Sequence, residues 1–146
     1  MNTPSDLAIG LISSLDIDSF DSVPTGTLVL VNPSTLAPTT STVTLASAEN
    51  PLRKKIELAK QRKYRNDVQK TGKIQFSDPA EEIEEETDYL VTSTLGWSLT
   101  QAGAPLPFSA DAARTLYADP KKHWVRAQVI AALGKTELFI KDSAKP

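Results

Sequence analysis

Apolar and polar residues alternate with a period of two in two short segments, "TLVLV" at residues 27–31 and "TVTLA" at residues 42–46. The apolar positions of this alternation are Leu28, Leu30, Val43 and Leu45. β-branched residues stand between them, which is typical of half-buried strands. The segment that separates them, "NPSTLAPTTS", is rich in turn-forming residues. The pattern therefore predicts two antiparallel strands joined by a wide loop.

An isolated hairpin is only marginally stable in water, so the predicted pair of strands needs a further surface. We predict a third strand at residues 17–20, within "DIDSFD", which would complete a small N-terminal antiparallel β-sheet. Residues 1–15 are then expected to form an N-terminal extension, and residues 16–49 a small β-unit.

After residue 49 the sequence contains regularly placed residues that begin and end helices. Asn50-Pro51, Asp78-Pro79 and Asp119-Pro120 each place an N-cap residue before a proline at the first helical position, and Ser109 can cap a fourth helix. Gly72 and Gly134 stand where helices can end. We predict helices over residues 51–71, 79–96, 110–118 and 120–133. The fold class is α+β, with the small sheet followed by a C-terminal bundle of about four helices; residues 50–134 are the helical domain and residues 135–146 a C-terminal tail.

The large apolar residues of the second half are expected to form one core. Its predicted members are Leu90, Leu95, Trp97, Leu106, Phe108, Leu116, Tyr117 and Trp124. If Trp124 is buried there, the Trp124→Ala change should cost about 3–5 kcal/mol. The triplet Leu138-Phe139-Ile140 either packs back on this core or forms an exposed hook that holds a partner. In the second case, truncation after Gly134 leaves a folded monomer that no longer assembles.

Charge is segregated between the first two predicted helices. The first carries the cations Arg53, Lys54, Lys55, Lys60, Arg62, Lys63, Arg65 and Lys70. The second carries the anions Glu81, Glu82, Glu84, Glu85, Glu86 and Asp88. We expect the basic helix to be mostly solvated, or to lie against something acidic. A basic helix also allows binding of nucleic acid, but the adjacent acidic run does not favour that interpretation.

The sequence offers little for catalysis. It contains no cysteine and one histidine, His123, which we expect to be a surface residue in the first turn of a helix. Asp16, Asp18 and Asp21 lack the glycine and the terminal glutamate of a calcium loop. No apolar run approaches the length of a membrane helix. We therefore expect no catalytic residue, no metal, no cofactor and no membrane partner, and a protein that is not an enzyme.

Two parts of the chain resemble a known family. "DIDSFD" with "TGTLVLVNPSTLAPTTSTVTLASAENP" resembles the N-terminal part of tail assembly chaperones of tailed bacteriophages. The stretch "LVTSTLGWSLTQAGAPLPFSADAARTLYADPKKHWVRAQVIAALGKTELFI" resembles their C-terminal half more closely, with several short motifs in the same order. The resemblance covers most of the chain from Asp16 onward. It departs from the family at Leu36-Ala37, where a Gly-Glu turn is usual, and in the first fifteen residues.

The resemblance implies a role in assembly rather than a reaction. Such proteins coat the long, largely helical tape measure protein, keep it soluble, and recruit tail tube subunits during tail morphogenesis. The implied partners are thus the tape measure protein and the tail tube protein, with homo-oligomerisation left open, and the implied location is the host cell cytoplasm. The residues predicted to bind the partner are Trp97, Leu99, Phe108, Tyr117, Trp124, Leu138, Phe139 and Ile140. The alternative is a structural tail or connector protein that stays in the virion tail.

Overall fold

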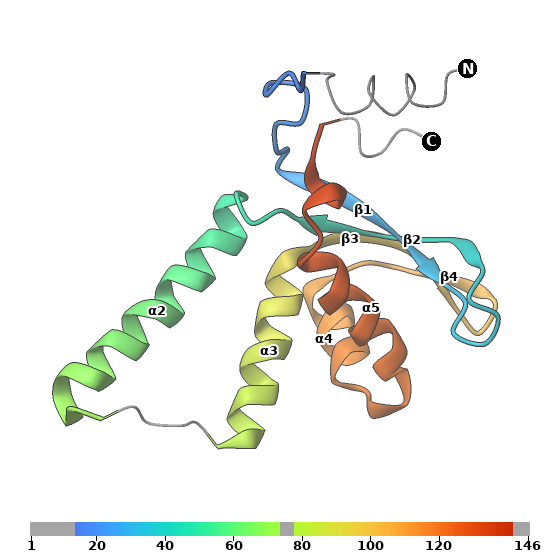
Figure 1. Cartoon of the computed structure of the whole chain (residues 1–146). Coiled ribbons are helices and arrows are strands. Elements are labelled where there is room, and N and C mark those ends of the chain that lie inside the picture. The colour runs from blue at the N-terminus through green and yellow to red at the C-terminus, as the bar shows by residue number, and fades with distance from the viewer. Residues whose placement is uncertain (1–13, 74–77, 142–146) are drawn as a thin grey trace.

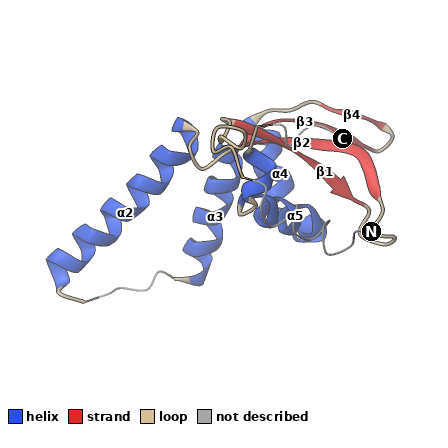
Figure 2. Cartoon of the chain, turned by 45° about the horizontal axis from the view of Figure 1, so that its top comes forward, coloured by secondary structure: helices blue, strands red, loops and turns tan. Residues whose placement is uncertain are grey.

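The fold is a four-stranded antiparallel sheet with helices packed against one of its faces (Figures 1 and 2). The computed structural model describes residues 14–73 and 78–141. Helices α3, α4 and α5 lie beneath the sheet, whereas α2 projects away from it (Figure 1). The predicted α+β class is confirmed, although the strands precede the helices only in part, because two of the strands follow α2 and α3 in the chain.

The sheet brings together strands from both halves of the chain. Its strands are β1 (Thr25–Val31), β2 (Pro38–Ala46), β3 (Thr94–Gln101) and β4 (Ala104–Leu106), and they lie in that order. The predicted hairpin is β1 and β2, with Leu28 opposite Val43. Val43 also lies opposite Trp97 of β3, so the apolar positions of the three strands share one face. This face packs on the helices and forms half of the core.

The third strand is not the one that the sequence predicts. Residues 17–20 form turns, because the Asp16 carboxylate accepts a hydrogen bond from the amide of Asp18 and the Asp16 carbonyl accepts one from Ser19, both at 3.0 Å. The second predicted helix, 79–96, ends at Ser93, and the chain enters β3 without a loop. Two features explain the change: from Thr94 to Leu99 the sequence alternates as a strand does, and the edge of β2 offers backbone partners.

Two tight turns use left-handed backbone. Ala102 and Gly103 join β3 to β4 with φ angles of 50° and 80°, as a two-residue hairpin turn requires. Leu36, in the loop between β1 and β2, has a φ of 62°. The Asn32 side chain organises this loop by accepting hydrogen bonds from the amides of Ser34 and Thr35. The loop thus forms without a glycine, with Leu36 in a left-handed conformation that is unfavourable for a residue with a side chain.

Three of the four predicted helices begin where the capping residues predict, whereas the predicted helix 120–133 begins as a 3₁₀ turn and becomes an α-helix only at His123. The α-helices are α2 (Pro51–Thr71), α3 (Pro79–Ser93), α4 (Ala110–Ala118) and α5 (His123–Leu133), with short 3₁₀ turns η1 (Pro120–Lys122) and η2 (Thr136–Phe139). The side chains of Asn50, Asp78, Ser109 and Asp119 each accept a hydrogen bond from the backbone two or three residues later. Gly72 ends α2 with a φ of 67°, and α5 ends before Gly134.

The core includes only part of the predicted set. Leu90, Leu116 and Tyr117 are buried, and Trp97 and Leu106 are partly buried against them. Phe108 and Trp124 are 37% and 39% exposed, so the prediction that both are core residues is wrong. Small residues and valines on α4 and α5 occupy the interior instead. These interior residues are Ala113, Val125, Val129 and Ala132.

The C-terminal triplet packs back on the core, which contradicts the exposed hook. Phe139 is 5% exposed, and its carbonyl accepts a hydrogen bond from Val23 at 2.8 Å. Ile140 forms a β-bridge with Ser22. A glycine is required opposite this segment, since a Cβ on Gly26 would lie 2.5 Å from the Leu138 carbonyl oxygen. Residues 139–141 therefore pair with the segment that precedes β1.

Some expectations concern residues that the structure does not describe. The predicted N-terminal extension lies outside the described residues except for Ser14 and Leu15, as does the last part of the predicted tail. Within residues 14–73 and 78–141, no helix combines the length and the apolar character that crossing a bilayer requires.

Candidate functional site

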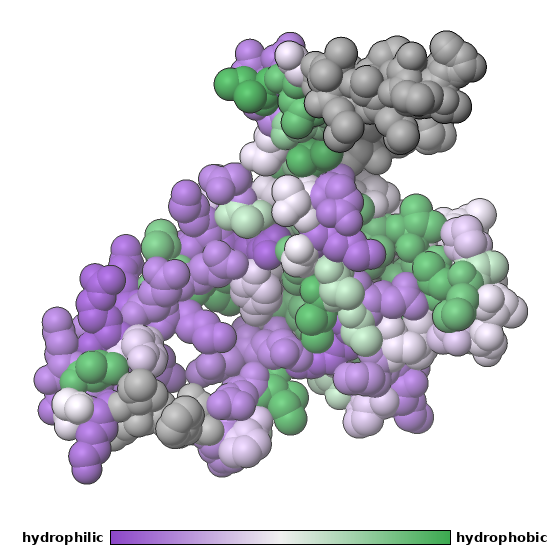
Figure 3. All heavy atoms as spheres, viewed as in Figure 1, coloured by the Kyte–Doolittle hydropathy of each residue, from purple (hydrophilic) through white to green (hydrophobic). Residues whose placement is uncertain are grey.

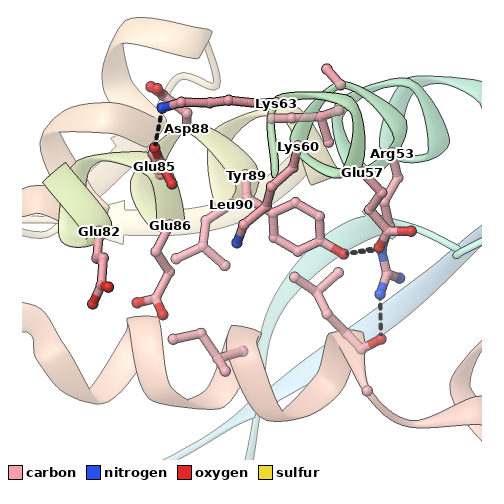
Figure 4. Close-up of a pocket in the computed structure, with 15 residues that line it drawn as sticks. Arg53, Glu57, Lys60, Lys63, Glu82, Glu85, Glu86, Asp88, Tyr89 and Leu90 are labelled. Carbon is pink, nitrogen blue, oxygen red and sulfur yellow. Dashed lines mark hydrogen bonds and ion pairs between the residues drawn. The ribbon is translucent and has the colours of Figure 1, made fainter. Parts of the chain in front are cut away.

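A cleft of about 830 Å³ lies between α2, α3 and the end of α5 (Figure 4). One wall is α2 and the other is α3, and side chains of α5 contribute to the floor. The apolar lining residues are Ile56, Ala59, Leu90, Ile130 and Leu133. The volume is within the range of ligand sites, but the cleft is open along one side, as a groove for a macromolecule would be.

Arg53 anchors the base of the α2 wall. Its guanidinium donates to the carbonyl of Ala46 at 3.1 Å, to the carbonyl of Leu133 at 2.8 Å, and to the hydroxyl of Tyr89. It is 7% exposed, which contradicts its predicted place on a solvated basic face. Carbonyl oxygens at the ends of β2 and α5 have no partner within their own elements, so a buried guanidinium is held here by several acceptors. The first turn of α2 is thereby fixed to the sheet and to α5.

Tyr89 joins the two walls at the same end of the cleft. Its hydroxyl donates to a carboxylate oxygen of Glu57 on α2 at 2.8 Å (Figure 4). Burial raises the pKa of Tyr89, the bond to Glu57 raises it further, and the Arg53 guanidinium acts in the opposite direction. The hydrogen bonds of Tyr89 to Arg53 and Glu57 hold α2 and α3 together at this end of the cleft.

Arg126 fixes the opposite side of α3. Its guanidinium donates to the Glu86 carboxylate at 2.7 Å, to the Thr87 hydroxyl at 2.8 Å, and to the Tyr117 carbonyl at 2.8 Å. Arg126 is 7% exposed, and it ties α3 to α4 and α5. The acidic wall of the cleft is therefore rigidly attached to the core, while the basic wall is attached at its N-terminal end.

The two walls carry opposite charge. Lys60 and Lys63 line the cleft from α2, and Glu82, Glu85 and Glu86 line it from α3. Lys63 and Glu85 form an ion pair at 3.4 Å across the cleft. Hydrophilic residues cover α2 and α3 over most of the face in view (Figure 3). The site is a groove with an apolar floor between a basic and an acidic edge.

The residues predicted to bind a partner do not form one surface. Tyr117 and Phe139 are buried, Leu99 is 9% exposed, and Leu138 and Ile140 are partly covered. The Trp97 indole donates to the Leu106 carbonyl at 2.8 Å and packs edge-on against the Phe108 ring with centroids 5.0 Å apart. Leu99 and Trp124 meet in a second, smaller hollow of about 370 Å³ at the far end of the sheet. None of the eight residues lines the cleft between α2 and α3.

Sequence analysis missed the cleft because its apolar residues are few and lie on three separate helices. The signal that could have found it is the pair of consecutive helices with opposite charge, because two such helices can form the two edges of a groove. Ile56 and Ala59 lie one turn apart on α2, next to Lys60 and Lys63. Such a stripe is too thin to mark a core helix, but it is wide enough for one edge of a groove.

The described residues contain no candidate metal centre. Within residues 14–73 and 78–141, no group of three or more His, Cys, Asp or Glu side chains could hold a metal ion. His123 is exposed in the first turn of α5. The pKa of Asp119 is lowered, first by the backbone amide of Lys121, which is the ordinary effect of an N-cap. Comparison of the chain with protein-family models, curated protein sequences and solved structures found no match.

Proposed function

We propose that this protein is a non-catalytic tail assembly chaperone of a tailed bacteriophage, which binds the tape measure protein and promotes assembly of the tail tube. The observation that carries the proposal is the groove between α2 and α3, with its apolar floor and charged edges. Amphipathic helices bind to other proteins by laying an apolar stripe into a groove of this kind. The resemblance of the sequence supplies the identity of the partner, a long and largely helical protein.

The dimensions of the groove suit one helix. The α3 residues that line the groove run from Glu82 to Leu90, so this wall is about 13 Å long and covers about two and a half turns of a bound helix. Ile130, on the floor, is 40% exposed in the chain alone. Covering such residues contributes free energy at about 25 cal/mol per Å² of apolar surface, part of which is lost in ordering the partner. A single groove would hold its partner weakly and reversibly, which suits a chaperone that leaves the assembled tail.

The proposal predicts co-purification with the tape measure protein of the same phage. Ala59 lies on the floor of the groove and Leu58, 41% exposed, does not line it. The Ala59→Glu variant should lose the tape measure protein, because an unpaired carboxylate would be placed against the partner's apolar stripe. The adjacent Leu58→Glu variant, with the same added charge, should retain it. The measurement is the amount of soluble tape measure protein recovered after co-expression with each chain.

Two results would contradict the proposal. Equal recovery with both variants would mean that the partner, if one binds, does not occupy the groove. Presence of the chain in purified mature virions at near-stoichiometric amounts would instead indicate the alternative, a structural tail or connector protein. Quantitative mass spectrometry of the particles measures that amount directly.

A further inference from the structure

The opposite charges of the two groove edges indicate which charges the partner helix carries on either side of its apolar stripe. The edge formed by α2 presents Lys60 and Lys63, and the edge formed by α3 presents Glu82 and Glu85. The Lys63–Glu85 pair is the one ion pair that joins α2 to α3 within the described residues. Lys60 and Glu82 have no ionic partner in that part of the chain, so a charge between the edges can pair with each of them.

We propose that the groove selects a helix whose apolar stripe has acidic side chains on one flank and basic side chains on the other. The acidic flank lies along α2, where it meets Lys60 and Lys63. The basic flank lies along α3, where it meets Glu82 and Glu85. This inference rests on the proposed function, since it specifies the chemistry of the partner that the same groove holds.

The same arrangement fixes the direction of the bound helix. With its apolar stripe on the floor, a helix can run along the groove in either of two directions. Turning it end to end exchanges its flanks, so that the acidic flank then faces α3 and like charges meet on both sides. Like charges in contact across an interface are strongly unfavourable, and they discriminate between binding modes more than they change affinity. The groove therefore selects the direction in which the helix runs, in addition to its amphipathic character.

A polyanion does not fit this groove. A nucleic-acid backbone on Lys60 and Lys63 would also approach the carboxylates that line the opposite wall. Those carboxylates are Glu82 and Glu85; Glu86 and Asp88 also line the wall but pair with Arg126 and Arg114. Since phosphate contacts supply most of the affinity of nucleic-acid binding, such a wall would cancel it. The partner is therefore a protein helix with both signs of charge.

Two synthetic peptides of about 18 residues, long enough to span the groove, test the selection of flanks. Both have the same composition and the same stripe of leucine and alanine. In the split peptide all glutamates lie on one flank and all lysines on the other, whereas in the mixed peptide both signs alternate on each flank. We expect the full-length protein to bind the split peptide at least about tenfold more tightly by fluorescence anisotropy at low salt. At about 1 M salt the difference should largely disappear.

The outcomes separate this inference from the proposed function. Equal affinity for both peptides would show that the apolar floor alone selects the helix, which overturns the inference and leaves helix binding intact. Binding of neither peptide would overturn both. Sedimentation measures whether the protein associates with itself. If it does so without peptide, and the split peptide does not disperse the assembly, the groove binds a second copy of the chain. That result would also overturn the inference.

Exchanging the charges of the two edges tests the direction. A variant with Lys60→Glu, Lys63→Glu, Glu82→Lys and Glu85→Lys keeps the cross-groove pair in reversed form. A nitroxide at the N-terminus of the split peptide should broaden the amide signals at one end of the groove in the wild-type protein, and at the other end in this variant. The matched control exchanges Lys55, Arg62, Glu81 and Glu84, exposed residues of the same two helices that do not line the groove, and should leave the direction unchanged. Broadening of both ends, or of the same end in both proteins, would overturn the assignment.

Discussion

Two buried arginines, Arg53 and Arg126, hold the helices in place through hydrogen bonds to backbone carbonyls and to neighbouring side chains. Each is 7% exposed. Arg53 was predicted to be solvated because seven other cations follow it in the same helix. What distinguishes it is its position in the first turn of α2, where the Ala46 and Leu133 carbonyls converge. Only the folded chain brings those acceptors together, so the sequence pattern could not identify the residue.

Replacing Arg53 by methionine should destabilise the protein by about 3 kcal/mol, because two buried carbonyls and the Tyr89 hydroxyl lose a charged donor while most of the side-chain volume is kept. Urea unfolding followed by circular dichroism measures this loss. The same change at Lys55, which is exposed on the same helix, should alter the free energy of unfolding by less than about 0.5 kcal/mol. Similar values for the two variants would mean that Arg53 has no anchoring role.

Alkaline pH should weaken the fold through two tyrosines. Burial raises the pKa of Tyr117, although a hydrogen bond to Thr94 opposes the effect, and burial also raises the pKa of Tyr89. Above the ordinary value of 10.0 the unfolded chain loses these protons while the folded chain keeps them, so the free energy of unfolding falls as pH rises. Thermal melts between about pH 8 and pH 11 should show a shallower decline for Tyr117→Phe than for the wild type. If the melting temperatures of the two proteins fall in parallel as pH rises, Tyr117 does not contribute to the loss of stability.

Among the elements, β3 and the C-terminal segment differ most from their sequence signals. β3 continues directly from α3, and its role as an inner strand between β2 and β4 depends on pairing with residues about 50 positions earlier in the chain. The triplet at residues 138–140 is apolar between polar neighbours, which is compatible with either a hook or a core segment. The absence of a side chain at Gly26 decides this case, because it leaves room for the ring of Phe139.

Truncation after Gly134 should destabilise the fold rather than produce a stable monomer. It removes the buried Phe139 ring and the backbone bonds to Asp21 and Val23, and loss of a buried aromatic side chain alone costs about 3–5 kcal/mol. Thermal unfolding of the truncated chain measures the effect. The full-length Gly26→Ala variant should be destabilised for the same reason, since its new methyl group would displace this segment. Unchanged melting temperatures of both variants would mean that residues 138–140 are not part of the core, as in the hook hypothesis.

At the scale of the whole molecule, α2 is attached to the rest of the fold by fewer buried residues than α3 is. The sheet includes strands from residues 25–46 and from residues 94–106, so the core cannot form from either half alone. Arg53 is the one buried residue of α2 among those described, whereas α3 has three, Thr87, Leu90 and Ser93. The wall of the groove that carries the lysines is therefore held by fewer buried residues than the wall that carries the glutamates.

Hydrogen exchange should reveal this difference in stability within one molecule. Amides in the second half of α2, after Lys60, should exchange through local opening at a free energy well below that of global unfolding, since few buried contacts hold them. Amides of Val43, Leu45 and Trp97 should exchange only when the whole core unfolds. NMR-detected exchange across a series of low urea concentrations measures both. Equal protection of α2 and the sheet would show that α2 is packed more firmly than its burial indicates.

The sequence by itself determined the features that depend on neighbours along the chain. Asn50, Asp78, Ser109 and Asp119 mark helix starts because a side-chain oxygen reaches an amide two or three residues away, whatever surrounds it. The hairpin of β1 and β2 followed from a period of two, and the end of α2 followed from Gly72. These local rules gave the α+β class and most helix boundaries.

Only the tertiary structure decided which elements meet. Whether Thr94–Gln101 continues a helix or joins a sheet depends on the free edge of β2, and whether Arg53 is buried depends on two carbonyls that lie 7 and 80 positions away from it in the chain. The groove has the same origin, because its floor and its two edges come from three helices that no local pattern relates. Contacts between distant segments are set by packing and by the satisfaction of buried polar groups, and these forces act only once the chain has folded.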